Sequence, residues 1–167
     1  MIEAIFRGRA HLPDPETAPE LFRGVIGRRA LALLVDVAIM ASVIGMFLVG
    51  GLIFSVLTLG LGLIILPFIV PVVIAGYYIL TLGSPMRATI GMKVFDLVLT
   101  PAAGTPLDVP RILIHPIIFW LTVWFAWPIS LAFAFFTPRR EMVHDYLTST
   151  LMVRRSPMVR HWRQARL

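Results

Sequence analysis

Two ionisable side chains, Arg29 and Asp36, stand seven positions apart at the start of a long apolar run. Seven residues make about two helical turns, so on a helix both side chains lie on one face, about 10 Å apart along the axis. An ionised carboxylate is costly inside a membrane and therefore needs a partner or a function. The pattern indicates either a carboxylate that binds a cation or proton, or a structural ion pair with Arg29, Lys93 or Arg111. The spacing leaves both interpretations open.

A second group of ionisable residues follows the last apolar segment, where His144 stands beside Asp145. Adjacent residues do not face each other on a helix, so their spacing does not predict a catalytic dyad. We interpret them as an interfacial histidine and an aspartate that caps a helix. His115 is predicted at the membrane interface, and His11 and His161 lie in the tails. The sequence therefore predicts no metal site and no cofactor.

Nucleophilic catalysis has no recognisable set of residues in this chain. The sequence contains no cysteine, which removes thiol catalysis, disulfides and thiolate metal sites. A nucleophile, a base and an orienting group cannot be named together. The segment TIGMK, residues 89–93, has Met86 where a phosphate-binding loop needs a glycine. We expect a protein that is not an enzyme.

Composition indicates what surrounds these residues. Of the 167 residues, 58% are hydrophobic and 14% are charged, whereas soluble domains carry about a quarter charged residues. Between residues 30 and 82 the only charged residue is Asp36. Because a membrane-spanning helix needs about 20 apolar residues, this stretch is long enough for two crossings. The sequence predicts an integral membrane protein.

The positive charge of the chain also fits a membrane. The net charge is +6, and all 15 basic residues lie outside the two long apolar segments. Membrane proteins keep basic residues there, beside the headgroups. The zinc-ligand spacings and aromatic–basic strips of nucleic-acid modules do not occur in the sequence. We expect membrane lipid as a partner and no nucleic acid.

Helix-breaking residues divide the chain into elements. Apolar helices are predicted at about residues 29–54, 61–82 and 112–136, with a break at 58–62 and a kink near Pro67 and Pro71. Two β-branched stretches are predicted as short strands, 93–100 and 148–155. The domain organisation is a flexible N-terminal segment at 1–21, a membrane domain at 22–155 and a basic tail at 156–167. The expected fold class is an all-α membrane protein with two transmembrane helices, a third apolar helical segment that spans or re-enters, and a short cytoplasmic β-hairpin-like element.

The positions of the basic residues predict how the chain crosses the membrane. Arginines and lysines precede the first helix, follow the second and follow the third segment, while the turn at 55–62 has none. Basic residues favour the cytoplasmic side, so we expect both termini there. The third segment would then enter and leave on one side, as a hairpin broken at Trp127 and Pro128, and the two strands could pair in the cytoplasm. A plain third span is the alternative.

Three short motifs, in this order, resemble the RDD family of small bacterial membrane proteins: RALALLVD at 29–36, TIGMKV at 89–94 and HDYLTSTLMV at 144–153. The family is named for one arginine and two aspartates, which match Arg29, Asp36 and Asp145. The resemblance covers about residues 22–154 and implies a multi-pass protein of the bacterial cytoplasmic (inner) membrane.

The middle motif departs from the family pattern. The family's usual Thr-x-Gly-Lys matches Thr89 and Gly91, but Met92 stands at the lysine position and Lys93 follows one position later. The loop lysine of the family is therefore not matched in register.

Two hypotheses follow from the residues and the resemblance together. Some members of the family are described as cation/proton antiporters, which implies a monovalent cation as a partner and Asp36 as the titrating ligand. Two or three crossings would need a homodimer or a larger membrane complex to form a transport path. In the other hypothesis the chain is a non-catalytic structural or accessory subunit of a membrane complex. Arg29, Asp36 and Asp145 would then hold the helices on the cytoplasmic strands.

Overall fold

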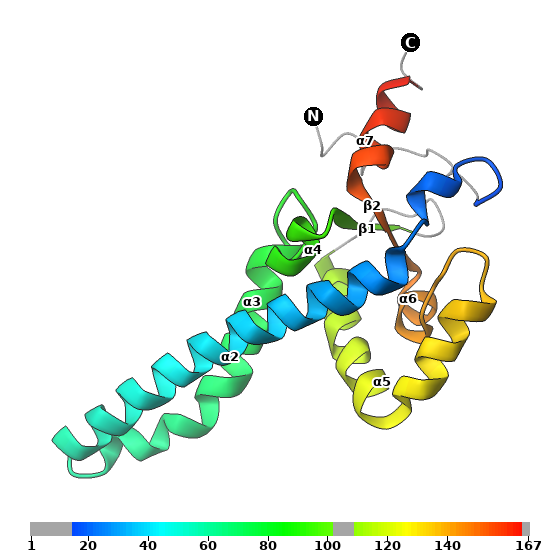
Figure 1. Cartoon of the computed structure of the whole chain (residues 1–167). Helices are drawn as coiled ribbons and strands as arrows, with labels where there is room; N and C mark the ends of the chain where they lie inside the picture. Colours follow the sequence, from blue (N-terminus) through cyan, green and yellow to red (C-terminus); the bar gives the residue numbers. More distant parts are fainter. Residues whose placement is uncertain (1–14, 102–108, 165–167) are drawn as a thin grey trace.

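The computed structural model describes residues 15–101 and 109–164. The three long helices are α2 (Val25–Leu57), α3 (Leu66–Leu82) and α5 (Val109–Phe136). The shorter elements are η1 (Pro19–Leu21), η2 (Leu61–Ile64), α4 (Ile90–Val94), α6 (Val143–Thr148), α7 (Arg155–Gln164), β1 (Leu97–Pro101) and β2 (Thr150–Arg154). Figure 1 shows α2 and α3 as a hairpin that projects away from the other elements, which gather around its open end.

The α2–α3 hairpin contains the two predicted apolar helices, and the first is longer at both ends than predicted. The chain turns at Gly60, whose φ of 98° is a conformation that favours glycine. Gly62 lies against Ser55, where an added Cβ would be 2.7 Å from the Ser55 Cα, so the two arms meet closely. Pro67 opens α3 in the first turn, where a missing N–H costs no helical hydrogen bond.

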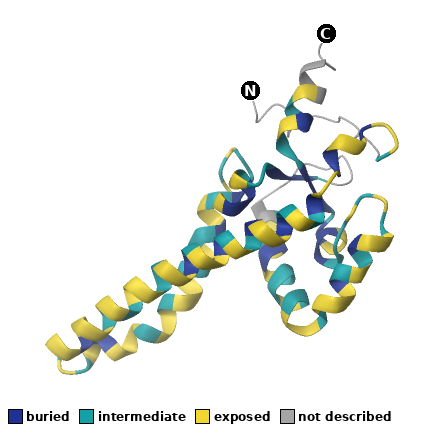
Figure 2. Ribbon diagram, in the orientation of Figure 1, coloured by how far each residue is buried: buried dark blue, intermediate teal, exposed yellow. Residues whose placement is uncertain are grey.

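Most of the hairpin surface is apolar and exposed. Val56, Leu57 and Leu80 are each more than three-quarters exposed, and Figure 2 shows exposed residues along both arms. Two helical segments, Pro19–Leu57 and Leu113–Phe136, are long and apolar enough to cross a membrane, and Leu66–Leu82 is a shorter apolar helix. An apolar surface of this extent is stable against lipid and unfavourable in water.

The two predicted strands pair, as expected. β1 and β2 run antiparallel, with Leu97 opposite Arg154. Because side chains alternate across a strand, the sheet is covered on both faces. Leu97 and Leu99 join the core with α2, α3 and α4, whereas Val98 joins a second core with η1 and α7. The predicted start of the first strand at residue 93 is wrong, because residues 90–94 form α4.

The helix α5 is bent, which confirms the predicted break at Trp127 and Pro128. Ala126 has φ −146° and ψ 29°, outside the helical region. Pro128 has no N–H for the carbonyl one turn earlier, and its ring crowds that turn. Figure 1 shows α5 as a V, with both arms returning toward the end of the molecule that holds the sheet.

Candidate functional site

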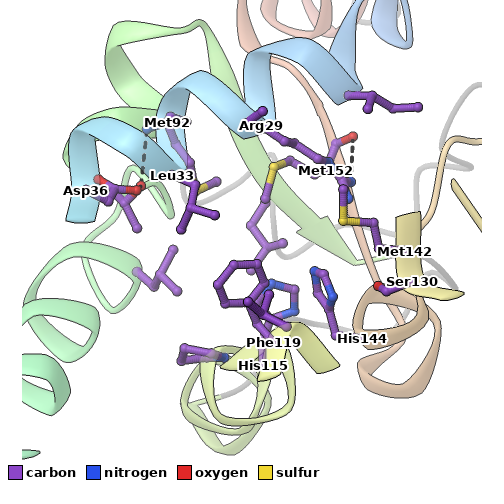
Figure 3. Close-up of a pocket in the computed structure, with 18 of the residues that line it drawn as sticks. Arg29, Leu33, Asp36, Met92, His115, Phe119, Ser130, Met142, His144 and Met152 are labelled. Carbon is purple, nitrogen blue, oxygen red and sulfur yellow. Dashed lines mark hydrogen bonds between the residues drawn. The ribbon is translucent and has the colours of Figure 1, made fainter. Parts of the chain in front are cut away.

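A cavity of about 440 Å³ lies where the long helices approach the sheet. Apolar side chains make most of its wall, and the polar side chains among its lining residues include Arg29, Asp36, Thr89, His115, Ser130 and His144. Figure 3 shows Asp36 beside Met92 on one side of this space, and the rings of His115 and His144 together on another. The cavity therefore brings together polar residues from the first, middle and last parts of the chain.

Asp36 is buried and accepts three hydrogen bonds. Its Oδ1 accepts from the Tyr77 hydroxyl at 2.5 Å and from the Gly91 backbone N–H at 2.7 Å. Its Oδ2 accepts from the Thr89 hydroxyl at 2.6 Å. These uncharged donors belong to α3 and to the start of α4, so the carboxylate fastens α2 to both elements.

Among the residues that the structure describes, Asp36 forms no ion pair with the basic residues considered for it. Arg29 turns to another carboxylate, and neither Lys93 nor Arg111 forms an ion pair with Asp36 among the described residues. Lys93 is half-buried on α4, and Arg111 lies in the first turn of α5. Met92, at the position of the family's lysine, is buried and lines the cavity.

The Thr-x-Gly segment supplies the hydrogen-bond donors that a buried carboxylate needs. Thr89 is the N-cap of α4, and its hydroxyl accepts the N–H of Met92 at 3.1 Å while it donates to Asp36. A Cβ on Gly91 would collide with the carbonyl oxygen of Ala32 and come within 2.8 Å of Asp36 Oδ1. Glycine at this position therefore lets α4 approach α2 closely enough to donate its N–H.

Arg29 pairs with Asp145. Its Nη1 contacts Asp145 Oδ2, and its Nη2 lies 3.5 Å from the carbonyl oxygen of Met152. Both partners are buried, with 7% and 0% of their surface exposed. Asp145 Oδ2 also accepts the Met142 N–H at 3.0 Å, which confirms the predicted capping aspartate. Although Arg29 and Asp36 start on one helix face, they reach different neighbouring elements.

The charges around Asp145 are set by burial and by Arg29. Burial raises the pKa of Asp145, but the neighbouring guanidinium opposes this and the net shift is downward, so the carboxylate is ionised. Burial lowers the pKa of His144, and the attraction of Asp145 for a protonated ring opposes that shift only in part. The His144 ring is therefore neutral near pH 7.

His144 and Asp145 contact each other, contrary to the prediction from their adjacency. His144 Nε2 lies 3.5 Å from Asp145 Oδ1, and His115 Nε2 lies 3.9 Å from the same oxygen. The two rings meet edge to face with centroids 5.2 Å apart. His144 and Asp145 share the first turn of the short helix α6, and each contacts a residue of α5. His115 is also buried, at 5% exposure.

Several hydroxyl groups complete the site and were missed from the sequence. Tyr77 reaches Asp36, while Thr148 and Thr150 lie 3.1 and 3.0 Å from His115 Nδ1. A hydroxyl within an apolar or buried segment is the signal that could have found them, because such a group needs a hydrogen-bond partner. The sequence does not show which partner, since each pair is more than 30 residues apart.

Comparison with known proteins places this arrangement in a family. A model of the RDD family matches residues 23–149, which include Arg29, Asp36 and Asp145. No curated protein and no solved structure matches the chain. The matched range holds α2, α3 and α5, the apolar helices of a membrane-protein domain. The chain belongs to the RDD family.

Proposed function

We propose that this chain is a multi-pass protein of the bacterial cytoplasmic membrane that acts, without catalysis of its own, as a structural or accessory subunit of a membrane complex. Arg29, Asp36 and Asp145, here called the clamp, hold its membrane helices on a cytoplasmic sheet. The observation that carries the proposal is where their hydrogen bonds go. Asp36 joins α2 to α3 and α4, and Arg29 joins α2 to α6 and β2.

The length of α2 supports a position of the clamp at the membrane edge. From Val37 to Leu57 the helix is about 30 Å long at 1.5 Å per residue, which matches the hydrocarbon core. Asp36 then lies at the cytoplasmic boundary, where a carboxylate costs less than at the bilayer centre. The sheet and the basic helix α7 lie beyond this boundary, on the side that basic residues favour.

The bend in α5 supports two crossings and one re-entrant segment. Both of its arms return toward the sheet, so α5 enters and leaves the membrane on one side. Two crossings by α2 and α3 then leave both termini in the cytoplasm.

Small residues on α2 support association with another membrane protein. Ala38, Ala41, Ser42 and Gly45 recur at helical spacing, and all four are exposed. Small side chains let helices approach closely in a membrane. A second copy of this chain, or a helix of a partner subunit, would pack along this face.

The test separates a structural role from transport. Purified wild-type protein and Asp36→Asn are placed in vesicles, and proton movement is followed after addition of Na⁺ or K⁺. We expect no cation-dependent proton flux above empty vesicles, together with lower thermal stability and abundance of the variant. Cation-dependent flux in the wild type that disappears in a folded Asp36→Asn protein would overturn the structural proposal.

A second candidate function, monovalent cation/proton exchange, is favoured by one observation. Asp36 lines the cavity, and among the described residues no basic side chain neutralises it. The hydroxyl oxygens of Tyr77 and Thr89 lie beside it, and hard cations bind oxygen ligands. The same flux measurement decides between the two functions.

A further inference from the structure

Three acceptor atoms converge between α5 and α6, beside the cavity that His115 and His144 line. The Nε2 atoms of His144 and His115 lie 3.5 and 3.9 Å from Asp145 Oδ1. Each of the three residues offers a ligand atom within 4.8 Å of the other two. All three residues are buried. Asp145 Oδ1 has no hydrogen-bond partner among the described residues, although Oδ2 of the same carboxylate has two. A buried carboxylate oxygen without a hydrogen-bond partner needs one, and a bound ion can supply it.

The hydrogen bonds of the threonines assign the proton of each ring. Thr148 donates its hydroxyl hydrogen to the carbonyl oxygen of His144 at 2.7 Å, so Thr150 is the donor in their 2.8 Å contact. Both hydroxyl oxygens can then only accept from His115 Nδ1, at 3.1 and 3.0 Å. Thr122 likewise donates to the carbonyl oxygen of Phe119 at 2.8 Å and can only accept from His144 Nδ1, which lies at 3.4 Å. With a hydrogen on each Nδ1, both Nε2 atoms carry lone pairs.

We propose that His115, His144 and Asp145 bind a divalent transition-metal ion such as Zn²⁺, through the two Nε2 atoms and Oδ1. Two neutral imidazoles and one carboxylate form a ligand set that suits zinc and neighbouring metals. Hydrogen bonds from Nδ1 to the threonines hold the rings in the orientation that metal-binding histidines need. Three protein ligands leave a fourth coordination position open, and two of them, His115 and His144, line the cavity. The site shares Asp145 with the clamp, but the proposal does not require the structural function proposed for the clamp.

The distances require only local movement. Ligands at about 2.0–2.2 Å from zinc stand roughly 3.3 Å apart in a tetrahedron. The two nitrogen–oxygen separations are 3.5 and 3.9 Å, so each must shorten by less than about 1 Å to reach this value. His144 has the longer Nδ1 contact, at 3.4 Å, and is the ring with the weaker restraint. Its ring can close the remaining gap to His115.

Arg29 limits the strength of the site. Its guanidinium binds Asp145 Oδ2, so Oδ1 stays free for the metal, but its charge repels a second cation. We therefore expect weaker binding than in a closed structural zinc site. The absence of cysteine removes the competing thiolate ligands from any measurement.

The test uses the full chain, purified in detergent without a histidine tag. Binding of Zn²⁺ is measured by calorimetry and by metal content after dialysis, and Co²⁺ serves as a spectroscopic probe. We expect one Zn²⁺ per chain, a rise in melting temperature with added Zn²⁺, and visible Co²⁺ bands typical of nitrogen and oxygen ligands. His115→Gln and His144→Gln should each lower the affinity at least about tenfold.

The matched control is the double variant His11→Gln/His161→Gln, which alters the other two histidines of the sequence and should bind as the wild type does. Binding that survives in folded His115→Gln and His144→Gln proteins, or that is lost in the control, would overturn the site. If neither single variant folds, the wild-type Co²⁺ spectrum decides: one equivalent with nitrogen and oxygen ligation supports the site, and no bound Co²⁺ refutes it.

Discussion

At the scale of single residues, the buried carboxylate of Asp36 is accounted for by three neutral donors. Two hydroxyl groups and one backbone N–H replace the water that Asp36 would have outside the protein. The short Thr-x-Gly segment supplies two of the three, because Thr89 both caps α4 and donates to the carboxylate. Gly91 is needed for a different reason, the close approach of two backbones.

The role of Gly91 leads to a prediction at this scale. Gly91→Ala should lower the free energy of unfolding by about 1–3 kcal/mol, because the added methyl meets the Ala32 carbonyl and the Asp36 carboxylate. The measurement is chemical unfolding in mixed micelles, followed by tryptophan fluorescence. Gly27→Ala is the matched control, since a Cβ there meets nothing within 4 Å and alanine favours the helix. Equal stability of the two variants would refute the close-approach argument.

At the scale of elements, the pattern of apolar residues, prolines and β-branched residues predicts where helices and strands lie, because these depend on residues close together in the sequence. Apolar runs and prolines locate α2, α3 and the bend in α5, and β-branched stretches locate the paired strands. The predicted element boundaries are wrong where a short helix-capping motif lies inside a stretch rich in β-branched residues. Residues 93–94 read as strand but belong to α4, because the Thr89 cap and the contact of Gly91 with α2 stabilise one helical turn.

Contacts between residues that are far apart in the sequence could not be predicted from the sequence pattern. Arg29 and Asp36 share a helix face, yet their partners are separated from them by 116 and by 41 to 55 residues. Spacing along one helix does not say which neighbouring element each side chain reaches. The same limit concealed the histidine pair, whose members come from α5 and α6.

The bend of α5 leads to a topology prediction. Single cysteines at Leu61, Pro138 and Arg160 are labelled in intact cells with a reagent that does not cross the membrane. These three positions are exposed, and the native chain has no cysteine to interfere. Leu61→Cys should label from outside, whereas Pro138→Cys and Arg160→Cys should label only after permeabilisation. External labelling at Pro138 would show that α5 is a full third span.

At the scale of the whole molecule, the clamp joins the membrane hairpin to the cytoplasmic sheet. Arg29 lies near the start of α2 and Asp145 lies in α6, so their ion pair joins two residues that are 116 positions apart in the sequence. A buried pair is not by itself a large gain in stability, but the removal of one partner leaves an uncompensated charge. We therefore expect the fold to depend on both partners together.

A double-mutant cycle on Arg29 and Asp145 tests this claim most directly. The free energy of unfolding is measured for the wild type, Arg29→Gln, Asp145→Asn and the double variant, without added metal. Each single change should cost about 3–5 kcal/mol, because it strands a buried charge. The double variant should be less destabilised than the sum of the two, by on the order of 1–3 kcal/mol. Additive effects, within about 0.5 kcal/mol, would contradict the clamp.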